Sequence, residues 1–132
     1  MKEQIDISTS RKIQMKEITE QIQSVIQRKG MKEGICVVYC PHTTAGLAIN
    51  ENADPDVCSD LEKAFEEVVP NVRFQHGEGN SPAHFLSCLT GSSLNLIVED
   101  SRLQLGRWQG VFFCEFDGPR QREVWVRLQP AQ

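Results

Sequence analysis

The residues after position 91 constrain the fold most, because short apolar segments alternate there with turn signals at close spacing. Asp100-Ser101 and the Asp-Gly-Pro sequence at 117–119 favour tight backbone reversals. Strands that follow one another through short turns pair antiparallel. The pattern therefore predicts an antiparallel meander of strands at residues 94–99, 102–105, 110–116 and 123–128.

Alternating apolar residues predict further strands in the first half of the chain. Residues 5–7 and 13–15 alternate on either side of Ser8-Thr9-Ser10, which predicts two short strands joined by a turn. Both alternating sets are apolar between Gly34 and Cys40, as in a strand covered on both faces. We expect this strand to be central, with residues 46–50 paired back on it.

Three segments carry helical signals. Apolar residues at positions 18, 22, 25 and 26 form one stripe, and Gly30 can supply the left-handed residue that ends the helix. Asp54-Pro55 begins a second helix, whose apolar stripe from position 57 to 68 we expect to be buried. Asn80-Ser81 begins a third, short helix that ends near position 91. The elements predict one α+β domain over residues 1–132, with two longer helices and one short helix.

Length and composition narrow the partners and the location. A chain of 132 residues can bury roughly two thirds of its unfolded surface as one domain. Its net charge of -4 and scattered basic residues lack the electrostatic footprint of a nucleic-acid-binding protein. Its apolar runs are shorter than the about 20 residues that span a bilayer, and its first residues contain no apolar signal core. We therefore expect a cytoplasmic protein with no nucleic acid or membrane partner.

The five cysteines are an odd number, so a complete set of intrachain disulfides is excluded and we expect reduced thiols. Cys36, Cys40 and Cys114 lie in apolar segments, where a thiol packs as a small hydrophobe. Cys40 and His42 share one side of an extended chain and offer a thiolate–base pair as an alternative. Packing is favoured, because reactive thiols need an exposed electropositive setting.

All three histidines lie in two short polar stretches, residues 40–46 and 76–84. A single histidine is more often an ordinary hydrogen-bonded residue than a ligand. Brought together, however, His42, His76 and His84 would leave one tetrahedral position open for water or substrate, as in catalytic zinc sites. We predict that they bind a divalent metal, with zinc the expected ion, and lower the pKa of its bound water from about 9 toward about 7.

The start of the third predicted helix favours an anion. Its unpaired N–H groups and partial positive charge stabilise a nearby phosphate by roughly 0.3 to 1 kcal/mol. The sequence contains no Walker loop, Rossmann glycine fingerprint, HExxH motif or Gly-x-Ser-x-Gly elbow. We therefore expect a phosphorylated small molecule as partner and no nucleotide cofactor.

Longer motifs, in order along nearly the whole chain, resemble the YjbQ family, also called secondary thiamine-phosphate synthases. They are HTTAG at 42–46, NENADPD at 50–56, EGN at 78–80 with Ala83-His84, and residues 106–110 followed by CEFDGPR at 114–120. The resemblance implies a sandwich of orthogonally packed antiparallel sheets, a homotrimer and a weak thiamine-phosphate synthase activity. Arg107 stands where the family usually has a small residue before Trp-Gln-Gly, which puts the substrate preference in doubt.

Three polar residues are the predicted catalytic partners of the metal. Glu51 and Asn52, before the second helix, could orient a histidine or the metal-bound water, although an ordinary polar loop explains them equally well. Asn80 is the third, at the start of the helix that would hold the phosphate, where it also serves as a cap. Asp54 is interpreted as a helix cap rather than a base.

Other residues are predicted to bind the substrate or to support the site. Trp108 offers a flat face for a pyrimidine ring, with the core or a subunit contact as the alternative. Glu115 alternates onto an apolar face and should be paired, with Arg120 as one candidate. The predicted substrate-binding residues are Thr43, Thr44, Ser81, Trp108 and Gln109.

Three classes of function remain open. The first is an enzyme that joins an aminopyrimidine diphosphate to a thiazole phosphate and releases pyrophosphate. The second is a metal-dependent hydrolase of a phosphorylated metabolite, and the third is a non-catalytic trimeric protein that binds a metabolite or metal. The absence of an aspartate-rich magnesium motif disfavours an efficient synthase, and the polar histidine stretches disfavour the third class.

Overall fold

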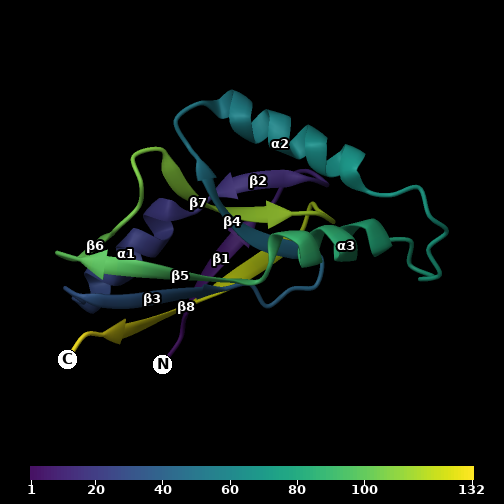
Figure 1. Ribbon diagram of the computed structural model, residues 1–132. Helices are drawn as coiled ribbons and strands as arrows, with labels where there is room; N and C mark the ends of the chain where they lie inside the picture. The colour runs from purple at the N-terminus through teal and green to yellow at the C-terminus, as the bar shows by residue number, and fades with distance from the viewer.

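The computed structural model describes residues 1–132, which form a mixed α/β domain with three helices (Figure 1). The elements in chain order are β1 (Glu3–Ser8), β2 (Gln14–Glu17), α1 (Thr19–Lys29), β3 (Gly34–Tyr39), β4 (Ala45–Glu51), α2 (Pro55–Val68), α3 (Ser81–Thr90), β5 (Ser93–Glu99), β6 (Arg102–Leu103), β7 (Gln109–Glu115) and β8 (Gln121–Pro130). A membrane-spanning helix is not found among α1, α2 and α3.

The strands form two antiparallel sheets. The larger has the order β1-β8-β3-β5-β6 and the smaller has the order β2-β7-β4. One apolar core fills the space between these sheets and α1, with side chains such as Val38, Leu47 and Phe113. A second core lies on the other face of the smaller sheet, where Phe112 and Phe116 pack against residues of α2 and α3. Figure 1 shows α2 on the side of the smaller sheet that faces away from the larger sheet.

The predicted strands exist, but several predicted pairings are wrong. Only β5 and β6 pair as neighbours of the expected meander, because β7 crosses to the smaller sheet and β8 inserts between β1 and β3. The first two strands do not pair with each other either, since β1 joins β8 and β2 joins β7. Likewise, β4 pairs with β7 and not with β3. The turns are local, whereas each strand's partner is set by which apolar faces the two cores can bury.

The central position of β3 is confirmed, but its predicted burial on both faces is wrong. Cys36 and Val38 point into the core and are fully buried. The alternate residues Ile35 and Tyr39 remain 48% and 42% exposed. No helix covers this outer face, because α1 packs on the opposite side of the sheet.

The three helices begin and end close to the predicted positions. α1 buries Ile22, Val25 and Ile26 and ends at Gly30, whose φ of 68° is left-handed. Asp54 caps α2 by accepting a hydrogen bond from the Asp56 N–H at 2.9 Å. The apolar stripe of α2 is not buried as predicted, since no residue of this helix is fully buried. This helix lies outside the second core and covers it from one side only.

Candidate functional site

A buried ion pair lies where β7 and β8 approach each other. Glu115 ends β7 and is fully buried, and the Arg122 side chain on β8 is only 6% exposed. Arg122 donates from Nε and Nη2 to the two carboxylate oxygens, and Thr9 Oγ1 donates to Oε1 at 2.7 Å. Nη2 also donates to Thr44 Oγ1 at 2.9 Å. Glu115 is therefore paired as predicted, but with Arg122 and not with Arg120.

The hydrogen bonds to Glu115 keep its carboxylate ionised. Burial alone would raise the pKa of this group, but the hydrogen bonds from Arg122 and Thr9 outweigh burial and hold the pKa below its ordinary value. Gly118 leaves room for this arrangement, because a Cβ at this position would lie 2.8 Å from Glu115 Cγ and would overlap the Arg11 carbonyl.

A second carboxylate–arginine pair lies in the turn between β7 and β8. Asp117 Oδ2 accepts from Arg120 Nη2 at 2.9 Å and from Asn80 Nδ2 at 3.1 Å. Burial would raise the pKa of Asp117, but these two hydrogen bonds lower it below the ordinary value. The Asn80 side chain thus ties the start of α3 to this turn and makes no capping bond to its own helix, contrary to the cap prediction. Its Oδ1 is buried and has no hydrogen-bond partner.

The two arginines open onto a pocket that we call the polar pocket, which has a volume of about 350 Å³ and no apolar residue in its wall. Its residues come from the loop before β4, the segment before α3, α3 itself, the turn before β8 and β8. They are Thr43, Thr44, His76, Glu78, Asn80, His84, Arg120 and Arg122. The predicted Ser81 begins α3 but is not part of this wall.

A larger hollow of about 790 Å³, the adjacent pocket, shares Thr43 and His84 with the polar pocket. The rings of Tyr39 and Trp125 stack at one side of it, with centroids 5.7 Å apart. The full lining is Tyr39, Cys40, Pro41, His42, Thr43, His84, Ser87, Cys88, Gly91, Ser92 and Trp125. His84 therefore lies at the boundary between a polar space and a wider, partly aromatic one.

The structure places two of the three histidines side by side. The rings of His76 and His84 are perpendicular, with centroids 5.6 Å apart, and His76 Nε2 lies 4.0 Å from Glu78 Oε2. His42 lies in the adjacent pocket, where its Nε2 is 3.0 Å from the Glu123 carbonyl oxygen and 3.1 Å from the Glu123 backbone nitrogen. Burial, and then the charge of Arg122, lower the pKa of His42. This shift favours the neutral imidazole, whose Nε2 is occupied by the Glu123 backbone.

The predicted three-histidine geometry is not formed within the chain. His42 Nε2 is occupied by a backbone hydrogen bond, and no three His, Cys, Asp or Glu side chains are placed to share a metal ion. The alternative pair of Cys40 with His42 also lacks support, since burial raises the pKa of the Cys40 thiol. His76 and His84 are the predicted ligands that do lie together.

Four other predicted site residues lie at the opposite end of the smaller sheet. Ala45 pairs with Glu115 near the polar pocket, whereas Glu51 pairs with Gln109 at the far end of the same two strands. Six residue steps along a strand separate these ends by about 20 Å. Glu51, Asn52, Trp108 and Gln109 therefore do not reach the polar pocket of their own chain.

The contacts of these residues are structural within one chain. Asn52 Nδ2 donates to Glu17 Oε2 at 2.8 Å, and Gln109 Oε1 accepts from the Gly106 N–H at 2.7 Å. Trp108 is 54% exposed, with the Arg107 guanidinium 4.9 Å from its ring. Trp108 is thus neither in the core nor against either pocket.

Arg122, Thr9 and Asp117 belong to the site but were not predicted as site residues from the sequence. A signal for the charged residues was present, because acidic residues at 115 and 117 and arginines at 120 and 122 lie at mirrored positions about residues 118–119. Residues two apart on an extended chain share one side, so the outer two and the inner two can pair across the turn. The observed pairs follow that nesting.

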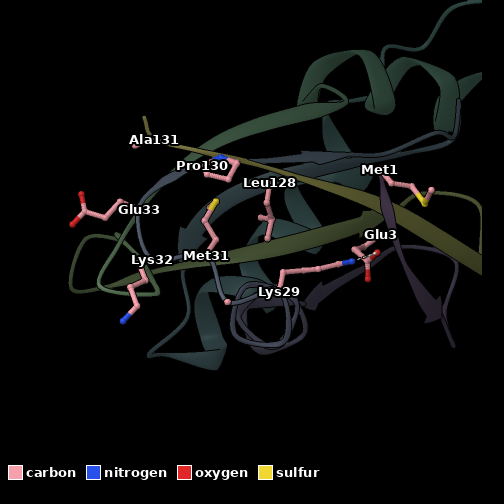
Figure 2. A pocket seen from close by; sticks show the side chains of 10 residues that line it. Met1, Glu3, Lys29, Met31, Lys32, Glu33, Leu128, Pro130 and Ala131 are labelled. Atoms are coloured by element: carbon pink, nitrogen blue, oxygen red, sulfur yellow. Dashed lines mark ion pairs between the residues drawn. The ribbon is translucent and has the colours of Figure 1, made fainter.

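One further hollow lies at the other end of the molecule, beside the end of α1, and has a volume of about 500 Å³ (Figure 2). Its walls include both chain ends, with Met1, Met31, Leu128 and Pro130 among them. Figure 2 shows Lys29 reaching toward Glu3, to which its Nζ is paired at 3.3 Å. This hollow holds no histidine or arginine and is a weaker candidate for chemistry than the polar pocket.

Comparisons with known sequences agree on one family. The sequence model of the family described as "UPF0047 protein YjbQ-like" matches residues 3–131. The chain is 46% identical over 126 residues to UPF0047 protein YugU of Bacillus subtilis, which covers 94% of this chain and 96% of that protein. It is 48% identical over 123 residues to a UPF0047 protein of Methanocaldococcus jannaschii, covering 92% of this chain and 89% of that protein.

Solved structures share the fold. An uncharacterised yjbq/upf0047 family protein from Clostridium acetobutylicum matches with a TM-score of 0.91 and 46% identity, over 96% of this chain and 98% of that chain. A hypothetical protein from Aeropyrum pernix K1 matches with a TM-score of 0.92 and 32% identity, over 99% of both chains. The resemblance expected from the sequence motifs is confirmed, and the chain belongs to the YjbQ-like UPF0047 family.

Proposed function

We propose that this protein is an enzyme that acts on a phosphorylated small molecule, whose phosphate binds in the polar pocket. The observation that carries the proposal is the pair of guanidinium groups, Arg120 and Arg122, in a pocket without apolar residues. Each arginine is held by a carboxylate behind it. A planar guanidinium forms directed hydrogen bonds to phosphate oxygens, which gives orientation as well as attraction.

His84 links phosphate binding to a reaction. It lines both pockets, so a phosphate next to Arg120 and an organic group in the adjacent pocket would meet beside its ring. An imidazole has a pKa suited to giving or taking a proton near neutral pH. His84 can therefore donate a proton to a leaving oxygen, while the arginines stabilise the charge that develops on it.

The family resemblance suggests one specific reaction of this class. It is the joining of an aminopyrimidine diphosphate to a thiazole phosphate, with release of pyrophosphate. In this reaction the polar pocket would hold the departing pyrophosphate, and the stacked pair Tyr39 and Trp125 would border the ring-bearing part. In this proposal, Tyr39 and Trp125 make the stacking contact with the ring that was expected of Trp108 from the sequence.

Hydrolysis of a phosphorylated metabolite is the second candidate reaction. The neighbouring His76, His84 and Glu78 favour it, because imidazole and carboxylate groups can activate a water molecule. A divalent metal, with zinc the expected ion, remains a proposal for His76 and His84, and it would supply a Lewis acid beside the phosphate. A non-catalytic binding protein would hold the same ligands without turnover.

We also propose that the chain assembles as a homotrimer in the cytoplasm. The outer face of the larger sheet supports self-association, because Ile35, Ile97 and Tyr39 are 48%, 60% and 42% exposed there. Light scattering should give about three times the chain mass of 14.9 kDa. Ile97→Glu should lower this mass, whereas Leu89→Glu on α3 serves as a control for an exposed apolar residue elsewhere.

The enzyme proposal is tested by ligand binding and product analysis together. Calorimetry with inorganic phosphate and pyrophosphate should show binding that weakens about tenfold or more in Arg120→Gln, because a charge-assisted hydrogen bond is lost. Arg102→Gln on β6 is the matched control, since it removes a positive charge outside both pockets. Mass spectrometry with the two thiamine precursors, and with simple phosphate esters, separates the reactions. Phosphate binding without turnover of any of these substrates would favour the non-catalytic binding protein.

A further inference from the structure

The guanidinium of Arg122 has only one terminal nitrogen left for a ligand. Its Nε and Nη2 are occupied by Glu115 and Thr44, and Nη1 makes no hydrogen bond within the chain. The only buried side-chain polar atom without a partner is Asn80 Oδ1, so Nη1 reaches solvent. Because Arg122 lines the polar pocket, Nη1 is the edge available to an anion there.

The carboxylate that holds this guanidinium is itself fixed from several directions. Oε1 of Glu115 accepts from Thr9 Oγ1 at 2.7 Å and from Arg122 Nε at 2.8 Å. Oε2 accepts from Arg122 Nη2 and from the backbone N–H groups of Phe116 and Asp117, both at 3.1 Å. A rotation of the carboxylate would break bonds at both oxygens, so Arg122 has a rigid support.

We infer that Glu115 is a positioning residue of the phosphate site: it fixes Arg122 so that Nη1 meets a phosphate oxygen in the polar pocket. The inference rests on the proposed function, since it assumes that this pocket binds the phosphate. Glu115 is not part of the pocket wall and does not itself touch the ligand.

Geometry and net charge make opposite predictions for this residue. A pocket that binds anions only through its net charge would bind them more tightly without Glu115. The negative charge of Glu115 offsets the positive charge of Arg122, because the two groups form a direct ion pair. A pocket built for directed hydrogen bonds needs the guanidinium held in one orientation. The complete hydrogen bonding of Glu115 favours the second design.

The inference also predicts which anions the pocket prefers. A fixed Nη1 donor increases the affinity for an anion whose oxygens lie in defined directions, such as phosphate. Chloride is spherical and gains nothing from the orientation of the donor. The ratio of phosphate affinity to chloride affinity therefore measures positioning, whereas partial unfolding would reduce binding of both anions.

The decisive variant is Glu115→Gln, tested by calorimetry with inorganic phosphate and by chloride competition. Glutamine keeps one acceptor oxygen, but its NH2 group would face donors of Arg122 or the backbone. We expect phosphate affinity to fall about tenfold or more, and the phosphate-to-chloride ratio to fall with it. Attraction by net charge alone would instead raise the phosphate affinity.

Two gentler changes keep the test decisive should this variant fail to fold. Glu115→Asp preserves the charge but withdraws the carboxylate by one methylene, so phosphate binding should weaken although the net charge is unchanged. Thr9→Val removes one donor to Oε1 and also the acceptor of the Arg120 backbone N–H at 2.9 Å, and Thr9→Ser restores both. Thermal melting with each variant identifies those that are folded.

The outcomes separate the inference from the proposal beneath it. Absence of phosphate binding by the parent protein would reject both. A second outcome is that the parent binds phosphate, Arg120→Gln weakens this binding, and folded variants of Glu115 and Thr9 bind phosphate like the parent. This outcome would support the phosphate site and overturn the positioning role of Glu115. Weaker phosphate binding with a lower phosphate-to-chloride ratio supports the inference.

Discussion

Asn80 Nδ2 donates a hydrogen bond to Oδ2 of Asp117 at 3.1 Å, which joins the residue before α3 to the turn between β7 and β8. The same carboxylate oxygen accepts from Arg120. A single carboxylate thus aligns the start of a helix with one of the two arginines of the polar pocket. This link makes Asn80 a contributor to the pocket's shape.

Asn80→Ala should therefore weaken phosphate binding with little change in stability. The substitution removes a hydrogen bond to a charged acceptor, worth about 1.5 to 3 kcal/mol, but it also removes the buried, unpaired Oδ1, whose desolvation costs about 1 to 3 kcal/mol. The two effects oppose each other, so the melting temperature should change little. Calorimetry with phosphate and thermal melting check the two parts.

The exposed loop residue Asn71 supplies the control, because its side chain makes no hydrogen bond to the turn between β7 and β8. Asn71→Ala should leave both phosphate binding and the melting temperature unchanged. If Asn80→Ala binds phosphate as tightly as the parent, the link to Asp117 does not shape the pocket.

Acid should destabilise the fold through Glu115. Its folded-state pKa is lowered, so its contribution to stability is complete above the ordinary carboxyl pKa of about 4.3 and is lost as the pH falls through the folded-state pKa. Urea unfolding at a series of pH values should show stability falling over this window. In a folded Glu115→Gln variant, the free energy of unfolding should decrease less steeply as the pH falls. An equal pH dependence in both proteins would mean that other carboxylates cause the decrease.

Gly118→Ala should destabilise the turn between β7 and β8 and disturb the site. The added Cβ would lie 2.8 Å from Glu115 Cγ and would overlap the backbone carbonyl of Arg11, neither of which can move freely. Such overpacking costs about 1 to 3 kcal/mol. Gly77→Ala is the matched control, because a Cβ there meets no atom within 4 Å. The free energy of unfolding in urea should be lower for Gly118→Ala than for Gly77→Ala. Equal stabilities would show that the turn accommodates the added methyl group.

Local features of the fold were predictable from the sequence. The spacing of Ile22, Val25 and Ile26 with Gly30 depends only on neighbouring residues, and α1 follows it. The pairing of β7 and β8 with strands distant in sequence could not be read from the turn between them. Which side of each strand is buried depends on partners that alternation alone does not identify.

The candidate site was predictable to a similar extent. Both predicted polar stretches line one pocket, since Thr43 and Thr44 of residues 40–46 lie there with His76 and His84 of residues 76–84. His42 was expected to join as a third ligand, but the Glu123 backbone on β8 occupies its Nε2. That bond depends on the placement of β8 beside the loop after β3, which no local pattern specifies.

The histidine substitutions should differ in their effect on bound metal. If the protein carries zinc, His76→Ala and His84→Ala should each lower its content sharply, because their rings lie together at the polar pocket. His42→Ala should retain the metal, since His42 Nε2 is bonded to the Glu123 backbone. Metal analysis of the purified variants, with melting curves to confirm folding, measures this. An equal loss in all three folded variants would restore the three-histidine site and require His42 to leave its backbone partner.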